Sequence, residues 1–491
     1  MRRDSKVRPD CSTGRGGQGL GESCSNRTMA RHPAPPATDE EADRLCATAG
    51  RLAELGRFEE AKRDYLAAIA LSPSHFAALN DLGALLYRHD FRAAARTCYA
   101  EAIRQHPDRP AARINLANAL LADGQSAEAR PHYEAALRLA PDHPDALQGM
   151  ANLLQDLGEA AAAETYRRRS YAKREIVIQA YRGQGRPCRV LQLVSAAGGN
   201  VPTRFLLDRT MFEISTLAVE SAAADGPLPR HDLVFNAVGD ADLSAGALDA
   251  AEDVLRRTKA PVINPPALVR LTGRAEIARR LSDLPGVITP RVAMVRRDRL
   301  EAEVEAFGCP VLLRSPGYHT GRNFVRVERI GDLASAASGL PGDDLLLIQP
   351  LDARDAQGRF RKYRVMLIGG RLYPLHLAIS DDWKVHYFTA DMAERPDHRA
   401  EEAAFLADMA GVLGDRAITG LSAIAERLGL DYAGVDFGLS PAGEVLLFEA
   451  NATMVVNPPD ADPRWDYRRG PVQAALDAAR EMIFARPGCP P

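Results

Sequence analysis

Hydrophobic and small side chains recur with a period of 34 positions between about residue 45 and residue 175. The repeated positions hold a turn residue, a small residue, a leucine, a tyrosine and a proline: Gly56, Asp90, Gly124 and Gly158; Ala61, Ala95, Ala129 and Ala163; Leu52, Leu86, Leu120 and Leu154; Tyr65, Tyr99 and Tyr133; Pro73, Pro107 and Pro141. Small residues let two helices pack closely, Gly or Asp suits the turn after a first helix, and Pro suits the connection after a second. The pattern therefore predicts an all-α solenoid of three helix pairs and a degraded fourth pair.

These repeats resemble the tetratricopeptide repeat (TPR). The resemblance implies a concave groove that holds a peptide or a protein partner on side chains of the first helices. The candidate side chains are Asn80, Arg113, Asn115 and Asn118. The alternative is that they only solvate the groove or cap helices. We expect the solenoid to span residues 41–180 and to end in a basic capping helix from Thr165 to Gln179.

The N-terminal segment, residues 1–40, differs in composition from the repeats. It is rich in Gly, Ser, Arg and Pro and has almost no large apolar side chains. Such a segment cannot offset the entropy of its own ordering, so we expect it to be disordered. Met29 is a possible alternative start, which a mass measurement on natively expressed protein would test.

The hydrophobic pattern changes after Pro187. Short apolar strands at Arg189–Ser195, His231–Asn236 and Pro261–Pro266 alternate with a helix at Ala247–Thr258. This alternation predicts an α/β unit with a parallel sheet over residues 186–268, with ligand-facing groups near the carboxyl ends of its strands. The polar residues near those ends are Ser195, Asn200, Asn236 and Asn264.

Strands dominate the next part of the chain. A strand, a glycine-containing loop and a second strand run from Cys309 to Glu328, and a continuous apolar strand runs from Asp344 to Leu351. A hairpin from Arg361 to Ala378 turns at Gly369-Gly370, a dipeptide that suits a tight hairpin turn. With the helices around them, these strands predict an α+β unit over residues 269–486.

The last predicted hairpin carries three hard oxygen ligands. Its strands, Tyr432–Leu439 and Glu444–Ala450, alternate faces, so Asp436, Glu449 and Asn451 can meet on one side. We expect the side chains of Val435, Phe437, Leu447 and Phe448 to lie in apolar surroundings. Carboxylates in apolar strands are costly unless they are paired or bind a cation, and Mg²⁺ takes oxygen ligands together with substrate phosphates. The hairpin therefore predicts a magnesium site, unless its acids simply face water.

The Gly-Val-Asp and Glu-Ala-Asn arrangement of this hairpin resembles the metal-binding end of the ATP-grasp superfamily. The resemblance covers roughly residues 186–486 and implies a multidomain chain, with an α/β pre-ATP-grasp domain at 186–268 and an α+β ATP-grasp fold at 269–486. It implies ATP and Mg²⁺ as cofactors, with the metal held by Asp436, Glu449 and Asn451. The implied activity is that of an ATP-dependent carboxylate–amine ligase, which joins small-molecule or peptide substrates through an acyl phosphate.

The same resemblance implies roles at further positions. Arg364 would lie over the transferred phosphate and the acyl group as the catalytic residue. The cofactor-binding positions would be Arg274, Arg314, Gly317, Gly321, Gln349, Leu351 and Lys362. Arg274 and Arg314 stand where the family usually has lysine, which keeps the charge but changes the geometry. Lys384 and His386, on one face of the following segment, are candidates for contact with substrate or phosphate.

Composition limits the partners and the environment. With 62 basic and 65 acidic residues, no whole-chain field favours nucleic acid. No apolar run approaches the roughly 20 residues that cross a bilayer, and no apolar segment follows Met1-Arg2-Arg3, so we expect no membrane partner and a cytoplasmic protein. The seven cysteines are odd in number and have no Cys-x-x-Cys spacing, so we expect reduced thiols without zinc or disulfides.

Two alternatives to the ligase remain open. Arginine at both usual lysine positions, and Met454-Val455-Val456 in place of the Pro-Gly usual after the Asn, are compatible with a non-catalytic nucleotide-binding scaffold whose repeats recruit a partner. An ATP-grasp kinase is the other alternative, and it would phosphorylate a hydroxyl acceptor.

Overall fold

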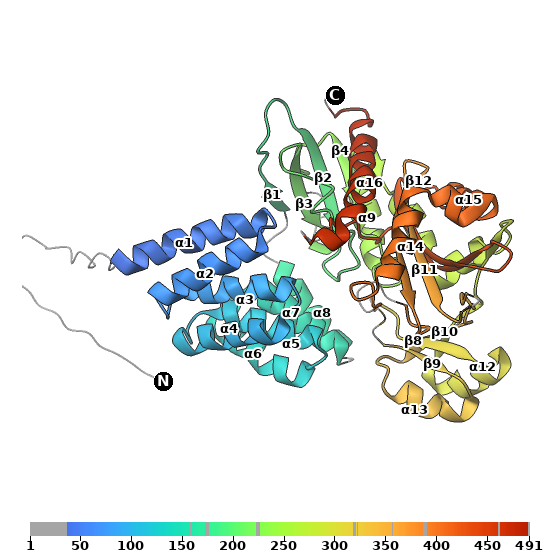
Figure 1. Ribbon diagram of the computed structural model, residues 1–491, viewed down its shortest axis with the longest axis horizontal. Coiled ribbons are helices and arrows are strands. Elements are labelled where there is room, and N and C mark those ends of the chain that lie inside the picture. Colours follow the sequence, from blue (N-terminus) through green and yellow to red (C-terminus); the bar gives the residue numbers. More distant parts are fainter. Residues whose placement is uncertain are drawn as a thin grey trace, which may run out of the picture.

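The computed structural model describes residues 37–157, 159–171, 176–221, 226–317, 321, 323–355, 357–385, 390–459 and 462–489. A helical part lies at one end of the molecule and a part built on three sheets lies at the other (Figure 1). The predicted fold class is confirmed: an all-α TPR solenoid precedes an α/β unit and an α+β unit. Most of the segment predicted to be disordered lies outside the described residues, and its last four residues already belong to the first helix.

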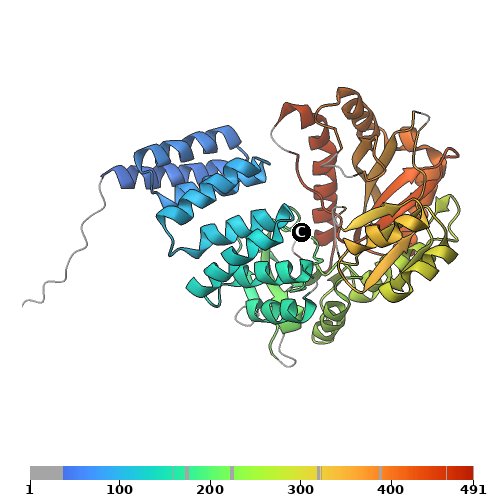
Figure 2. The ribbon, with the colours of Figure 1, turned by 90° about the horizontal axis from the view of Figure 1, so that it is seen from below.

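Eight helices form the solenoid, and Figure 2 shows them stacked in sequence order. Their bounds are α1 (Ala37–Glu54), α2 (Phe58–Leu71), α3 (Phe76–Arg88), α4 (Arg92–Gln105), α5 (Pro110–Ala122), α6 (Ser126–Leu139), α7 (Pro144–Asp156) and α8 (Ala160–Tyr171). The repeated alanines 61, 95, 129 and 163 are fully buried, as close helix packing requires. Gly56, Asp90 and Gly124 have positive φ angles, which Gly and Asp tolerate best. Gly158, the fourth turn position, lies outside the described residues.

The second unit is a five-stranded sheet with the order β1-β3-β2-β4-β5. Its strands are β1 (Ile176–Gln179), β2 (Cys188–Val194), β3 (Phe212–Ala218), β4 (Leu233–Asn236) and β5 (Val262–Ile263). The three predicted strands are confirmed as β2, β4 and β5, and they pair in parallel. Helix α9 (Ala245–Leu255) follows β4, near the predicted position.

Two strands of this sheet differ from the prediction. The prediction that a capping helix extends to Gln179 is wrong at its C-terminal end, because α8 ends at Tyr171 and residues 176–179 form strand β1. Strand β1 pairs antiparallel with β3, and the hydrophobic pattern predicted neither of these two strands. The partner of β1 lies more than 30 residues away in sequence, so local periodicity could not reveal the pairing.

The third unit holds two sheets. The smaller sheet has the order β7-β10-β8-β9, with β7 (Val292–Arg296), β8 (Val311–Arg314), β9 (Phe324–Val327) and β10 (Asp344–Ile348). Helices α12 (Leu300–Phe307) and α13 (Leu333–Ser338) pack on it around a core of their own. This sheet contains the predicted strand, glycine loop and strand, and the predicted apolar strand that follows.

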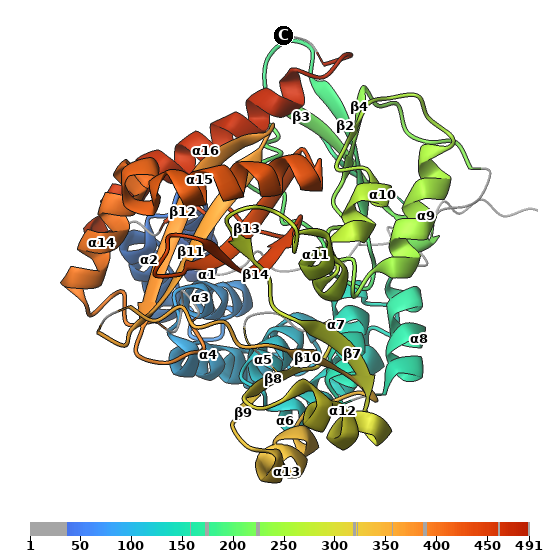
Figure 3. The ribbon, with the colours of Figure 1, turned by 90° about the vertical axis from the view of Figure 1, so that its right-hand side faces the viewer.

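The larger sheet has the order β12-β11-β13-β14-β6. Both predicted hairpins are confirmed, as β11 (Phe360–Ile368) with β12 (Arg371–Ser380) and as β13 (Tyr432–Leu439) with β14 (Val445–Asn451); β6 (Val287–Ile288) adds a short edge. Helices α14 (Pro396–Ala407), α15 (Met409–Leu428) and α16 (Asp466–Phe484) lie against it (Figure 3). One hydrophobic core joins this sheet to the parallel sheet of the second unit.

A disulfide between Cys188 and Cys489 contradicts the expectation that all cysteines are reduced. The two residues are 301 positions apart, which is why their spacing gave no signal. They meet because α16 returns the chain to the parallel sheet, where Phe484 stacks on Phe212 of β3 with ring centroids 4.9 Å apart. The free cysteines among the described residues are Cys46, Cys98 and Cys309.

Across the described residues, every helix is too short or too polar to cross a bilayer.

Candidate functional site

A cavity of about 940 Å³ lies between the two sheets of the third unit. Arg314 and Phe324 come from the smaller sheet, while Arg364, Asp436 and Glu449 come from the larger one. The segment after β14 and the first turn of α16 close a third side. Pockets for small ligands and cofactors typically measure about 300–1,000 Å³, so the cavity has room for a nucleotide and a second substrate.

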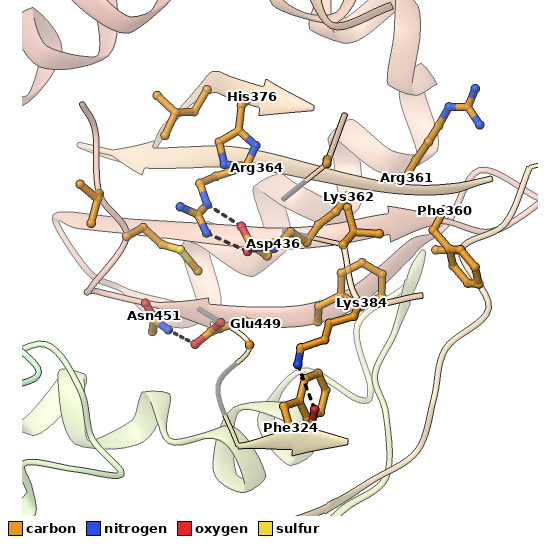
Figure 4. A pocket seen from close by; sticks show the side chains of 18 of the residues that line it. Phe324, Phe360, Arg361, Lys362, Arg364, His376, Lys384, Asp436, Glu449 and Asn451 are labelled. Atoms are coloured by element: carbon orange, nitrogen blue, oxygen red, sulfur yellow. Dashed lines mark hydrogen bonds and ion pairs between the residues drawn. The ribbon is translucent and has the colours of Figure 1, made fainter. Parts of the chain in front are cut away.

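A row of four polar side chains crosses the larger sheet along the floor of this cavity. His376 on β12 lies opposite Arg364 on β11, Arg364 lies opposite Asp436 on β13, and Asp436 lies opposite Glu449 on β14. Directly opposed residues on neighbouring strands share a face of the sheet, and all four line the cavity (Figure 4). Asn451, two residues beyond Glu449, lines it too. The convergence of the three oxygen ligands is confirmed, and their binding of a metal stays a prediction.

Asp436 sits at the centre of the row and is only 3% exposed. Arg364 donates from Nε to Oδ1 at 2.6 Å and from Nη2 to Oδ2 at 2.8 Å. The Nζ of Lys362 lies 3.2 Å from Oδ2. Burial alone would raise the pKa of Asp436, but Arg364 and then Lys362 outweigh burial and hold that pKa far below its usual range. The carboxylate is therefore charged and paired on both oxygens.

Glu449 also has two polar partners, Arg274 and Asn451. Nη2 of Arg274 and Nδ2 of Asn451 both donate to Oε1 of Glu449, each at 2.7 Å. Oδ1 of Asn451 accepts from the amide and the hydroxyl of Thr453. Arg274 is the first residue of α11 (Arg274–Arg280), and its backbone N–H donates to Asp242.

Two further cations, Arg314 on β8 and Lys384 after β12, line the cavity. Arg314 is buried above the ring of Phe324, 5.3 Å from its centroid. Burial and then the charge of Arg274 lower the pKa of Arg314 to about 10. Nζ of Lys384 donates to the carbonyl of Phe324 at 3.1 Å, and burial lowers the pKa of Lys384. An anion entering between these side chains would relieve their mutual repulsion.

Of the predicted glycine-containing loop between β8 and β9, the structure describes residues 315–317, 321 and 323. Gly317 and Gly321 have φ angles of 76° and 72°, a region that favours glycine. Gly321 lines the cavity, and a Cβ atom there would lie 2.8 Å from Cε of Lys384. Gly317 packs instead toward Leu243, so only Gly321 is placed at the cavity surface.

Gln349 and Leu351, two of the expected cofactor-binding positions, follow β10 and line the cavity, and their contact with a cofactor stays a prediction. The side chain of Gln349 already has a structural role, because its Oε1 accepts from the backbone N–H of Arg291 at 3.1 Å. The backbone N–H of Gln349 donates to the carbonyl of Arg291 at 2.9 Å. These two bonds tie the end of β10 to the chain before β7.

Several predicted residues have other surroundings than expected. Phe448 was expected in an apolar environment, but a bulge between Asp436 and Phe437 makes Phe448 the unpaired residue, and it is 37% exposed. Arg361, for which no role was predicted, points away from the row and pairs with Asp355 and Glu401 (Figure 4). His386 lies outside the described residues.

The polar residues at the ends of the parallel strands mostly join the two sheets. Asn264 binds the backbone of Tyr432 through both ends of its amide, at 2.6 and 2.9 Å. Asn236 donates to the carbonyl of Asn264, and Ser195 donates to Glu220. Of the four polar residues singled out there, Asn200 alone lines the cavity.

The residues present fit a magnesium nucleotide. Nine cationic and three carboxylate side chains line the cavity, and four of the cations, Arg326, Arg361, Arg464 and Arg468, pair with carboxylates outside the lining. The cations that remain suit a polyphosphate. Within the described ranges, no three His, Cys, Asp or Glu side chains form a group that could hold a metal. A magnesium ion would therefore be held by Asp436, Glu449 and the amide of Asn451 together with phosphate oxygens, which is how Mg²⁺ is usually bound.

Two residues of the cavity were missed by the sequence analysis. His376 is buried, and burial and then Arg364 lower its pKa well below the usual value. The sequence could have identified His376, because it is the one histidine of an otherwise apolar strand in the predicted hairpin. Arg468, in the first turn of α16, also lines the cavity, but nothing in its local sequence marks it.

A second cavity, of about 410 Å³, lies on the solenoid. Asn115 and Asn118 line it as predicted; Asn115 donates to Asn80, and Asn118 accepts from the hydroxyl of Tyr133. Arg113 is not part of it and donates to the carbonyl of Pro107. The other polar and aromatic side chains around it are Glu54, Tyr65, Asp81, Tyr87, Arg88 and Tyr99.

Comparison with known proteins supports the repeats directly. The tetratricopeptide repeat family model matches residues 47–90 and 84–144. Among solved structures, MamA from Desulfovibrio magneticus RS-1 is 20% identical over 26% of this chain and 73% of its own, with a TM-score of 0.25. The first TPR of Spaghetti (RPAP3), bound to an HSP90 peptide, is 20% identical over 24% of this chain and 94% of its own, with a TM-score of 0.24.

A further solved structure covers the C-terminal units. The VanG D-Ala:D-Ser ligase from Enterococcus faecalis is 14% identical over 60% of this chain and 99% of its own, with a TM-score of 0.38. No curated protein sequence matches this chain.

Proposed function

We propose that this protein is an ATP-dependent carboxylate–amine ligase that acts through an acyl phosphate on substrates brought to it by the TPR groove. The observation that carries the proposal is the row of His376, Arg364, Asp436 and Glu449 on one face of the larger sheet, inside a cavity with an excess of cations. Charged groups with perturbed pKa values that gather in a cavity are typical of functional sites, and phosphoryl transfer needs such charges there. The expected cytoplasmic location stays a prediction.

Each part of the cavity has a role in this proposal. Arg274, Arg314 and Lys384 hold the polyphosphate, and the strand end at Gln349 and Leu351 meets the adenine. Magnesium, when bound, neutralises phosphate charge and orients the phosphate that is transferred. Asp436, Glu449 and Asn451 hold the ion. Lys362 and Arg364, now paired with Asp436, can turn toward phosphate once the ion takes their place.

The chemistry requires no nucleophilic side chain. A carboxylate oxygen of the substrate attacks the γ-phosphorus of ATP, and the bond from that phosphorus to the ADP oxygen breaks. The amine nitrogen of the second substrate then attacks the acyl carbon, phosphate leaves with the bonding electron pair, and the nitrogen loses a proton. Arg364 stabilises the negative charge that develops on the acyl and phosphoryl oxygens.

The test is release of ADP by the full-length protein with Mg-ATP and paired panels of carboxylates and amines, including short peptides. We expect ADP release only with a matching pair, and a loss of about 100-fold or more in Arg364→Met, because removing one preorganised donor costs about 10²–10³ in rate. Arg371→Gln is the matched control, since Arg371 is exposed on the same hairpin and should leave the rate unchanged. Tight binding of Mg-ATP without ADP release from any pair would contradict the proposal.

A second candidate is a nucleotide-binding scaffold without turnover. One observation favours it: both oxygens of Asp436 are engaged by cations, as in a structural ion pair. The same experiment separates the two, with Asp436→Ala and Glu449→Ala added. A ligase loses ADP release in these variants, whereas a scaffold has none to lose and keeps its partner on the repeats.

A further inference from the structure

Arg468 stands at the opposite end of the cavity from Arg274. It lies in the first turn of α16, its side chain is only 11% exposed, and it lines the same cavity as Arg364 and His376. Arg468 has no part in the phosphate binding proposed above. A buried arginine at a cavity wall is costly to desolvate, so its position calls for a reason.

A buried carboxylate holds Arg468 from behind. Oε1 of Glu402, on α14, lies 3.5 Å from Nε of Arg468, and Glu402 is 0% exposed. The same oxygen accepts from the backbone N–H of Leu377, and Oε2 accepts from the hydroxyl of Tyr467 at 2.5 Å. The indole of Trp465 lies 6.0 Å from the guanidinium carbon of Arg468. Glu402 is itself held by β12 and α16, so its ion pair limits the movement of Arg468 before any ligand arrives, which lowers the entropy cost of binding.

Arg468 lies beyond the His376 end of the polar row. Leu377, whose N–H binds Glu402, directly follows His376, and the charge of Arg468 contributes to the lowered pKa of His376. Arg364 is the next residue of the row after His376, and the carboxylate that receives phosphate must lie near Arg364 and the acids beyond it. A group held by Arg468 therefore lies on the His376 side of Arg364, away from the acids.

The charge around Arg468 fits a single carboxylate. Glu402 already offsets one unit of charge, so this end of the cavity lacks the excess of cations that would hold a polyphosphate. A guanidinium can bind a carboxylate with two parallel hydrogen bonds. We propose that Arg468 binds the unreactive carboxylate of the amine-bearing substrate, so that this substrate is an amino acid with a free carboxylate. This inference rests on the ligase proposal for the same cavity.

Binding measurements test this without requiring turnover. Isothermal titration calorimetry on the full-length protein, with Mg²⁺ and a non-hydrolysable ATP analogue present, compares the standard L-amino acids and their D-enantiomers with the corresponding amides. We expect at least one amino acid to bind more tightly than its amide. Losing a hydrogen-bonded charge pair costs about 10- to 100-fold in affinity, so Arg468→Gln should lose that preference by this factor.

Two further variants separate binding from folding. Arg468→Lys keeps the charge and should retain part of the preference for the carboxylate, even if Arg468→Gln folds poorly. Arg469→Gln is the matched control, because Arg469 is the next residue on α16, pairs with Asp466 and lies outside the cavity lining. It should keep the full preference, and all variants should keep the affinity for the ATP analogue.

The outcomes distinguish this inference from the ligase proposal. No preference for any amino acid over its amide, or a preference that survives in Arg468→Gln, overturns the role of Arg468. ADP release with an amine that lacks a carboxylate, as fast as with its amino acid, also overturns it and leaves the ligase standing. Arg468-dependent binding of amino acids without any ADP release overturns the ligase and leaves the carboxylate site standing.

Discussion

Asp436 shows how the cavity keeps a buried acid charged before any ligand binds. Its oxygens are held by Arg364 and Lys362, and Glu449 is held by Arg274 and Asn451. Removing one partner from such a buried pair leaves an uncompensated charge, which is strongly destabilising. A metal ion can therefore replace these cationic side chains only if another anionic group pairs with them. Phosphate oxygens can do so.

We accordingly predict that metal binding depends on nucleotide. Mn²⁺, followed by electron paramagnetic resonance as a probe for Mg²⁺, should bind weakly to the protein alone and at least about 10-fold more tightly with a non-hydrolysable ATP analogue, a coupling of roughly 1.4 kcal/mol or more. Asp436→Asn should abolish the tight component. Asp477→Asn, an acid on α16 outside the cavity lining, should not. Equal Mn²⁺ affinity with and without the analogue would show that the acids are a preformed metal site.

Much of this site could be predicted at the residue level, because a hairpin links sequence spacing directly to position. Asp436 and Glu449 face each other for that reason. Arg468 could not be found in the same way. Its partner Glu402 lies on another helix, 66 positions earlier, and only the packing of α14 and α16 against β12 brings them together.

Among the elements, the solenoid helices show how one small residue decides the packing of a pair. A Cβ atom on Gly83 of α3 would lie 2.6 Å from Cε1 of Tyr99 on α4, and Tyr99 is buried. A similar close approach occurs between Gly149 of α7 and Tyr133 of α6, where the glycine belongs to the next helix pair. Each repeated tyrosine thus lies against a glycine of the neighbouring first helix.

We predict that Gly83→Ala destabilises the solenoid. Overpacking costs about 1–3 kcal/mol, which should exceed the roughly 1 kcal/mol that Ala gains over Gly in a helix. Gly50→Ala on α1 is the control, because its Cβ would meet only the hydroxyl of Tyr65, at 3.7 Å, and it should be stabilising. Thermal unfolding followed by circular dichroism measures both. A higher melting temperature in Gly83→Ala would show that Tyr99 moves aside freely.

The elements that were predicted correctly are those with local signals. The two hairpins of the larger sheet have strong apolar alternation and glycine turns, and the solenoid has its 34-residue period. Strand β1 has four residues with three exposed side chains, so its sequence does not distinguish it from a helix end. Its strand character comes from pairing with β3.

In the whole molecule, the disulfide between Cys188 and Cys489 closes into one loop the third unit and all of the second unit after β1. The start of β2 and the segment after α16 are the two ends of that part of the chain. Cross-linking positions so far apart removes much of the freedom of the unfolded chain.

We predict that reduction of this bond destabilises the protein. The oxidised protein should be more stable to denaturant than Cys188→Ser/Cys489→Ser by about 2–5 kcal/mol. A reductant should lower the unfolding midpoint of the wild type and leave the double variant unchanged. Cys309→Ser removes an exposed free thiol and should behave as the wild type. An unfolding midpoint insensitive to reductant in the wild type would contradict the prediction.

The strand β1 also sets how far the solenoid can travel from the cavity. Helix α8 ends at Tyr171 and β1 begins at Ile176, so five peptide steps of at most about 3.6 Å each connect the last helix to a paired strand of the sheet. A ligand held in the groove, as proposed, is therefore joined by a short stretch of chain to the sheet that shares a hydrophobic core with the floor of the cavity. Such tethers give local concentrations on the order of millimolar, so even a weakly captured peptide would meet the cavity as an intramolecular reactant rather than by diffusion.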